Sequence, residues 1–472
     1  MRVSFVLFLS LLAPVAAVGA DGPIPPDAAR SDKRVRDRLE WNRRTLEGAY
    51  DKVGKRDARW DRQAREAMGL AARNFGHQVD PIATRDEINR AAKAAIDAGC
   101  DDPMIFYLRV WSSTGLTPEQ EAQQIRVAAR GLKASGYPAC RRASALAIAV
   151  AFDKHPAASP AADKKEREAD MAASLALLAE SVAKDERGVD WEEKWYTTLS
   201  ILLGMNRKFG ADPPTAYGRI DAALAKFPEL KPLRLQFRGG FWVGYAWEAR
   251  SNGAAASVSQ AAFQAFAKRL QQGKEAYNQA WKARPGDART AAGMMVVEKG
   301  MGGGDRAAME LWFDRAIKAD PDCQDACYQK LEWLSPQWYG TSEEMLAFGK
   351  ACQATGNWRA KITPLAVTAH FRQATLLEPQ ARSDYLNSPA VWSQIKAVND
   401  EYLKHYPDDH AARTRYAVLA DLGRHEAQAL AQFRILGKDL VMWTDSPLMD
   451  LHSVEVMKTS LEFKATLEPL KD

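Results

Sequence analysis

The sequence lacks an excess of charge of either sign. Its 472 residues include 65 Lys and Arg against 60 Asp and Glu, a formal net charge of +5, and the two signs are interleaved along the chain. This balance offers no extended basic surface to nucleic acid or to an anionic membrane. Glycine and proline, at 30 and 23 residues, are near average usage, which excludes collagen-like and linker-dominated chains. A chain of this length is too long for one ordinary core, so we expect two or three domains or a repeat array.

Beyond the first 20 residues, the sequence has no uncharged apolar run of membrane-spanning length. Residues 1–20 are typical of a secretory signal peptide: Arg2 is followed by an apolar stretch over residues 3–12, and Val18-Gly19-Ala20 fits cleavage after Ala20. An uncleaved membrane anchor is the alternative. We expect a bacterial protein exported to the periplasm or the medium, without stable membrane insertion after cleavage. Its mature chain would begin with a Pro-rich linker over residues 21–31.

Cysteine is scarce and shows no zinc-binding spacing. The five are Cys100, Cys140, Cys323, Cys327 and Cys352, an odd number that leaves at least one unpaired in a monomer. Because export permits disulfides, we predict Cys100–Cys140 and a bridge from Cys352 to Cys323 or Cys327. Each would stabilise the fold by about 3 kcal/mol. The alternative is five separate buried thiols.

Catalytic and metal-binding motifs are also missing. None of the seven histidines forms a His-Glu-x-x-His or His-x-His pair, and His405 and His410 flank Pro407, so they cannot share a helical face. There is no Gly-x-Ser-x-Gly elbow; Ser393 and Lys396 have the spacing of a serine–lysine pair without the companion motifs of that class. No Lys-Ser or Lys-Thr follows the glycines of residues 300–304, so they indicate a turn and not a phosphate-binding loop. We therefore predict no catalytic residue, no metal and no cofactor.

Helical periodicity is present almost everywhere. Over residues 170–184 the apolar residues lie on one helical face. Thr117-Pro118-Glu119-Gln120 and Thr341-Ser342-Glu343-Glu344 are capping boxes that predict helix starts. The densely charged residues 32–65 predict solvated amphipathic helices, favoured over a polyanion-binding arm. The expected fold class is all-α.

A repeating pattern organises the second half of the chain. An apolar residue, an alanine three later and a proline five after that recur as Ile220/Ala223/Pro228, Tyr277/Ala280/Pro285 and Phe313/Ala316/Pro321. The alanine permits close helix approach and the proline ends the helix. These segments resemble the second helix of degenerate tetratricopeptide repeats, which implies paired helices stacked in a solenoid. We expect helical repeats over residues 32–154, a linker over 155–166, a middle helical region over 167–250 and further repeats over 258–472.

A narrower resemblance covers roughly residues 277–358. Residues 312–316 (WFDRA), 334–341 (LSPQWYGT) and 344–349 (EMLAFG) are similar to an uncharacterised bacterial family, the domain of unknown function DUF4034. That family has a Pro-x-Trp-Gly-Gly-Ser turn before a Met-Leu-x-Phe helix; here Tyr339 and Thr341 replace the first glycine and the serine. The resemblance implies helical repeats and carries over no activity or site residue.

Tryptophan, with 14 residues, is abundant. Packing between helices is the simpler explanation. The alternative is an aromatic groove, for which the candidate binding residues are Trp333, Trp338, Tyr339, Glu343 and Trp358. The favoured function is a scaffold that binds a protein or peptide along a solenoid surface. A glycan-binding protein or polysaccharide-acting enzyme that uses the Trp338, Tyr339 and Trp358 cluster is the alternative.

Overall fold

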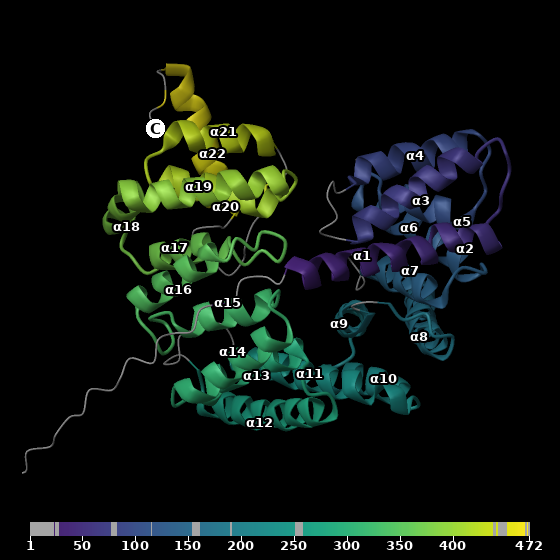
Figure 1. The fold of residues 1–472 in the computed structure, drawn as a ribbon, viewed down its shortest axis with the longest axis horizontal. Coiled ribbons are helices and arrows are strands. Elements are labelled where there is room, and N and C mark those ends of the chain that lie inside the picture. Colours follow the sequence, from purple (N-terminus) through teal and green to yellow (C-terminus); the bar gives the residue numbers. More distant parts are fainter. Residues whose placement is uncertain are drawn as a thin grey trace, which may run out of the picture. The chain divides into compact units, whose positions relative to one another are not determined.

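The computed structural model describes residues 28–76, 83–114, 116–152, 161–188, 191–250, 258–437 and 451–467, with Pro23, residues 440–441 and Leu470. Within these ranges the regular structure consists of α-helices and one short 3-10 helix, with no β-strand (Figure 1). The all-α fold class is therefore confirmed. The predicted signal peptide lies outside the described residues, and so does most of the 21–31 linker, inside which the first helix begins at Ala28.

The chain divides into two compact units, Pro26–Lys330 and Leu331–Asp472, which we call the N-terminal and C-terminal units. The helices of the N-terminal unit are α1 (Ala28–Thr45), α2 (Glu47–Val53), α3 (Asp61–Gly76), α4 (Arg85–Asp97), α5 (Pro103–Trp111), α6 (Pro118–Lys133), α7 (Ala139–Ala151), α8 (Ala161–Ala183), α9 (Trp191–Lys208), α10 (Pro213–Leu224), the 3-10 helix η2 (Pro228–Leu230), α11 (Lys231–Arg250), α12 (Gln260–Ala283), α13 (Ala288–Met301) and α14 (Arg306–Ala319). The C-terminal unit holds α16 (Ser342–Ala354), α17 (Leu365–Thr375), α18 (Pro379–Asn387), α19 (Pro389–His405), α20 (His410–Leu422), α21 (Glu426–Leu436) and α22 (Leu451–Leu467). The division falls within α15 (Gln324–Trp333).

Local signals set where these helices begin. Thr117 Oγ1 accepts the Gln120 N–H at 3.3 Å while Gln120 Oε1 accepts the Thr117 N–H at 3.1 Å. Thr341 and Glu344 form the same reciprocal pair at 3.2 and 3.1 Å. Both predicted capping boxes are confirmed. Each gives a partner to two N–H groups that have none inside the helix.

Two of the three instances of the predicted pattern coincide with helix ends and buried positions. In the first instance Ile220 is buried, but Ala223 is half-buried and α10 ends at Leu224, four residues before Pro228. Tyr277 and Phe313 are buried, as are Ala280 and Ala316. α12 ends at Ala283 and α14 at Ala319, each two residues before a proline of the pattern. Between α13 and α14 the predicted glycine turn is present, with Gly302 and Gly303 at φ of 80° and 86°, a conformation that glycine adopts without strain.

Neighbouring helices pack against each other along both units. From α3 to α8 every helix contacts the next one in the chain, and their shared core contains Leu108 and Leu146. In the C-terminal unit α16 contacts α17, α19 contacts α20, and α20 contacts α21, around a core that includes Phe371, Tyr416 and Phe433. Among the described helices, none combines the length and apolarity that crossing a bilayer would need.

The breaks predicted between domains fall inside the N-terminal unit. α8 begins at Ala161, within the expected linker over residues 155–166. Residues 251–257 lie outside the described residues, but α11 and α12 on either side of them pack against each other. Proline, alanine and serine accompany helix–helix connections as well as domain linkers, so composition alone does not distinguish the two.

Candidate functional site

One face of α1 is buried although its sequence is densely charged. Arg38, Trp41, Asn42 and Thr45 are all buried, and their spacing of three, four and seven residues puts them on one side of the helix. Between them, Glu40, Arg43 and Arg44 are exposed. The buried face of this amphipathic helix carries polar and aromatic groups in place of the usual aliphatic stripe.

Trp41 is the centre of this face. Its indole Nε1 donates to the backbone carbonyl of Glu186, between α8 and α9, at 2.9 Å. The Lys194 ammonium of α9 lies 4.5 Å from the ring centroid and the Arg141 guanidinium of α7 lies 4.7 Å from it. Two cations on one indole are favourable because the ring faces carry negative electrostatic potential. Trp41 thus joins α1 to three successive parts of the N-terminal unit.

Arg141 binds α1 through neutral acceptors. Its guanidinium donates to Thr45 Oγ1 at 2.7 and 3.0 Å and to Asn42 Oδ1 at 2.5 Å, and it lies 5.5 Å from the Phe75 ring centroid. Removal of this group from water lowers its pKa to about 10. Arg141 therefore stays charged at neutral pH, and hydroxyl, amide and aromatic groups supply its stabilisation.

The N-terminal half of α1 reaches the connection between α14 and α15. Arg34 forms an ion pair with Asp320 at 2.6 Å, Ser31 Oγ donates to Asp322 Oδ2 at 2.8 Å, and Arg30 donates to the Ala319 carbonyl. These partners lie 286 to 291 residues away from their α1 residues in the sequence. We call Arg141, Glu186, Lys194, Asp320 and Asp322 the α1-binding surface. It holds a helix through hydrogen bonds, ion pairs and one indole, contacts that suit recognition of a polar amphipathic helix.

The structure brings together three of the predicted aromatic residues. Trp333 is buried, and its ring centroid lies 5.0 Å from that of Tyr339, which in turn lies 6.3 Å from that of Trp338. Trp338 and Tyr339 are half-buried, and Glu343 nearby in sequence is exposed. A hydrogen bond with its own backbone N–H and another with the Thr341 side chain lower the pKa of Glu343. Trp333 therefore packs in the core, while Trp338 and Tyr339 keep accessible ring area.

Trp358 belongs to a different aromatic group. It stacks on His405, with ring centroids 5.9 Å apart, and its carbonyl accepts the Tyr406 hydroxyl at 3.4 Å. Tyr406 in turn lies against Tyr402, at 4.9 Å between ring centroids. Through these contacts the half-buried Trp358 packs the α16–α17 connection against the end of α19.

The predicted disulfides are not supported, because all five cysteines are free thiols. Cys100 follows α4 and Cys140 lies in the first turn of α7, and both are buried. Burial raises the pKa of Cys100, and raises that of Cys140 to about 12. Cys323 Sγ lies 3.9 Å from the Ala288 carbonyl, and Cys327 and Cys352 are fully buried. The thiols therefore pack as small apolar side chains.

His370, His405 and His425 have packing or hydrogen-bonding roles. His370 contacts the Tyr385 hydroxyl and the Gln394 side chain, and His425 stacks on Trp392 with ring centroids 3.9 Å apart. His77 and His155 lie outside the described residues. In the described part of the chain, no three His, Cys, Asp or Glu side chains converge to hold a metal ion. Lys396, from the serine–lysine spacing, pairs with Asp400 at 2.5 Å on an exposed face.

Sequence reasoning missed the α1-binding surface, although one signal for it was present. Arg38, Trp41, Asn42 and Thr45 recur at helical spacing. The tryptophan among them indicates a helix face that packs against other residues and does not face solvent. Its partners came from distant helices that no local pattern links to it. Comparison with known proteins adds no assignment: no family model matches the chain, and no curated protein matches it.

Proposed function

We propose that this protein is an exported helical-repeat scaffold that binds a helical segment of a protein or peptide partner in the bacterial cell envelope. The observation that carries the proposal is the α1-binding surface, where residues from separate helical hairpins of one unit bind a single polar helix. A surface that binds the chain's own helix through side-chain hydrogen bonds and ion pairs is chemically suited to a partner helix of the same pattern. The tetratricopeptide-like periodicity agrees with such a role.

The polar character of this contact favours replacement of α1 by a partner helix over permanent packing of α1. Arg34–Asp320 and Ser31–Asp322 are only partly buried, and water can replace such contacts at little net cost. A partner helix that presents arginines and one tryptophan at the spacing of α1 would make the same contacts. Export follows from the signal-peptide pattern of residues 1–20, so the partner is sought among envelope proteins.

A labelled peptide of residues 28–45 tests whether the surface binds a helix supplied in trans. In the full chain, Trp41→Ala should weaken the attachment of α1 and expose the α1-binding surface. We expect the peptide to bind this variant at least tenfold more tightly than the wild-type chain, because α1 competes in cis at high effective concentration. Fluorescence anisotropy measures both affinities. The matched control is Arg43→Ala on the exposed face of the same helix, which should bind the peptide as weakly as wild type.

A Trp41→Ala chain that keeps its helical circular dichroism but does not bind the peptide would remove the basis of this proposal. The glycan alternative rests on the adjacent, half-buried rings of Trp338 and Tyr339. Titration of peptidoglycan fragments, followed by tryptophan fluorescence of wild type and Trp338→Ala, tests it directly. Saturable glycan binding that is lost in Trp338→Ala, together with no peptide binding, would favour the alternative.

A further inference from the structure

Two kinds of contact attach the helix α1 to the N-terminal unit. Over residues 29–37 every side chain is exposed or half-buried, whereas Arg38, Trp41, Asn42 and Thr45 in the second half are buried. Water and dissolved ions therefore reach the contacts of the first half and are largely excluded from those of the second.

Charged side chains attach the first half. Arg34 forms an ion pair with Asp320 at 2.6 Å and lies 3.9 Å from the Glu193 carboxylate, and these three side chains are 27%, 20% and 55% exposed. Ser31 Oγ donates to Asp322 Oδ2 at 2.8 Å. Ion pairs that water reaches are weak, and dissolved salt screens them. Their contribution to the attachment of α1 therefore falls as ionic strength rises.

The first turn of α1 adds to this dependence on salt. It contains no acidic residue, although negative charge stabilises the N-terminus of a helix. Asp322, from the α14–α15 connection, lies at this end of α1, where it accepts the Ser31 hydroxyl. Its carboxylate therefore supplies negative charge from another element, and salt screens this interaction as well.

Uncharged acceptors attach the second half. Arg38 donates to the Gly76 carbonyl at 3.1 Å, and the Arg141 guanidinium donates to Thr45 Oγ1 and Asn42 Oδ1. Each of these contacts has one uncharged partner and is at least partly removed from solvent. Salt therefore weakens them less than it weakens an exposed ion pair.

We propose that α1 is released in two steps and that ionic strength controls the first step. At high ionic strength residues 28–37 detach from Asp320, Asp322 and Glu193, while residues 38–45 stay bound. The α1-binding surface is therefore partly open at high ionic strength and closed at low ionic strength. This regulation rests on the proposed function, because it sets how much of the surface a partner helix finds open.

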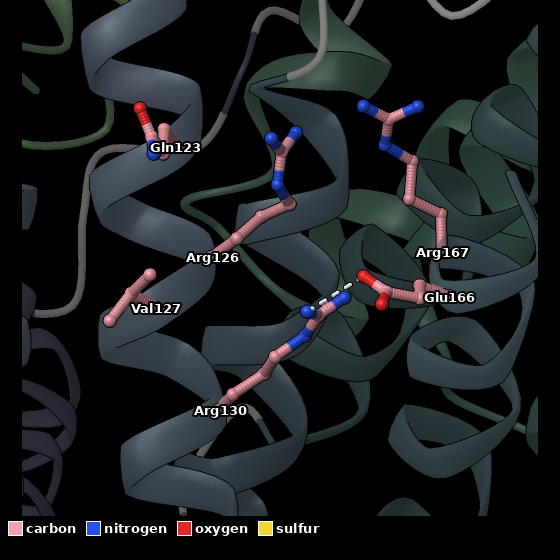
Figure 2. A pocket seen from close by; sticks show the side chains of 6 residues that line it. All are labelled: Gln123, Arg126, Val127, Arg130, Glu166 and Arg167. Carbon is pink, nitrogen blue, oxygen red and sulfur yellow. Dashed lines mark hydrogen bonds and ion pairs between the residues drawn. The ribbon is translucent and has the colours of Figure 1, made fainter. Parts of the chain in front are cut away.

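An ion pair in a small pocket between α6 and α8 of the same unit serves as an internal control (Figure 2). Arg130 donates to Glu166 at 2.9 Å and to the buried Asp170 at 2.8 Å. The two helices also contribute apolar side chains, such as Leu132 and Leu178, to a shared core. Salt screens the exposed Arg130–Glu166 pair, but the burial of apolar surface keeps α8 in place.

Hydrogen exchange of the full chain, read by mass spectrometry, tests the two steps without any partner. The measurement compares about 10 mM with about 500 mM sodium chloride, between which the Debye length falls from about 30 Å to about 4 Å. We expect the amides of residues 32–37 to exchange at least about fivefold faster at high salt, since these amides follow the four that have no partner inside the helix. The amides of residues 38–45 and of α8 should change by less than about twofold.

The variant Asp320→Asn separates the ion pair from other effects of salt. Asparagine keeps an oxygen for the Asp322 N–H, which Asp320 Oδ1 accepts at 3.1 Å, but it removes the negative charge beside Arg34. At low salt, residues 32–37 of this variant should exchange at least about threefold faster than in wild type, and their response to salt should be smaller.

Asp314→Asn is the matched control, because that carboxylate pairs with Lys318 of its own helix α14. It should exchange like wild type at both salt concentrations. Salt-independent exchange of residues 32–37, or equal acceleration of residues 38–45, would overturn the two-step release. A 28–45 peptide that does not bind Trp41→Ala would remove the proposed function and leave these exchange rates as they are, so the two failures are distinguishable.

Discussion

The Glu186 carboxylate accepts the backbone N–H groups of Ala139 and Cys140, at 3.1 and 2.9 Å, while the Glu186 carbonyl accepts the Trp41 indole N–H. α7 begins at Ala139 after Pro138, which provides no side-chain cap. A residue almost 50 positions away therefore caps α7, and the same residue anchors α1. The carboxylate also lies at the positive end of the α7 dipole, where a negative charge is stabilising.

Removal of this distant cap should weaken the N-terminal unit. We expect Glu186→Ala to lower the free energy of unfolding by about 1–2 kcal/mol, the usual cost of losing a helix cap. Urea denaturation followed by tryptophan fluorescence measures the change. Glu66→Ala, an exposed glutamate of α3, serves as the control and should stay within about 0.5 kcal/mol of wild type. Equal effects of the two substitutions would show that the Glu186 contact contributes nothing.

Loss of the indole should release α1 selectively. In Trp41→Ala the Glu186 carbonyl loses its donor, and Arg141 and Lys194 lose the ring they share. We expect the amides of residues 28–45 to exchange hydrogen at least tenfold faster, with little change in α19 to α21 of the other unit. Hydrogen exchange read by mass spectrometry resolves these segments. Uniformly faster exchange across the chain would mean that Trp41 supports the whole fold and not one helix.

His370 should make the C-terminal unit less stable in acid. Its Nδ1 lies 2.6 Å from the Tyr385 hydroxyl and its Nε2 lies 3.1 Å from Gln394 Oε1, while the Gln394 amide donates to Gln353 Oε1 at 2.5 Å. The His370 Nε2–H thus donates a hydrogen bond to Gln394 Oε1, and Nδ1 of the neutral ring accepts a hydrogen bond from the Tyr385 hydroxyl.

Burial lowers the pKa of His370 below its usual 6.5. Between the two values the unfolded chain binds more protons than the folded chain, so stability is complete above pH 6.5 and is lost as pH falls through the lowered pKa. We expect wild type to lose about 1 kcal/mol more than His370→Gln between pH 7 and pH 5. Urea unfolding at the two pH values gives this difference. Identical losses in the two proteins would show that His370 does not carry the pH dependence.

Asp421 should act in the opposite direction. Burial raises its pKa to about 6, against the opposing influence of the Lys464 charge. The folded chain therefore binds this proton more tightly, and stability is lost as pH rises from about 4 to 6. Because the ionised carboxylate is disfavoured at pH 8, Asp421→Asn should stabilise the chain there by about 1–2 kcal/mol and have less effect at pH 4. Unfolding free energies at the two pH values test the sign. Destabilisation at pH 8 would contradict it.

Helix positions could be predicted because their signals are local. The threonines of the capping boxes, the prolines two residues after α12 and α14, and the glycines between α13 and α14 each act within one turn of the chain. Apolar spacing gave the buried faces of these helices for the same reason. Contacts between distant residues have no such signal. Trp338 and Trp358 were predicted to share one aromatic cluster, yet Trp338 lies beside Tyr339 and Trp358 lies on His405.

The sequence alone determined that this chain is helical, where many of its helices end, and which side of several of them faces the core. These features depend on backbone hydrogen bonding and on apolar periodicity within a few residues. The tertiary structure decided which helices share a surface. It left five thiols free and packed Trp41 against Glu186 and Arg141. The candidate sites exist only after packing, because each is made from side chains that the chain holds far apart until it folds.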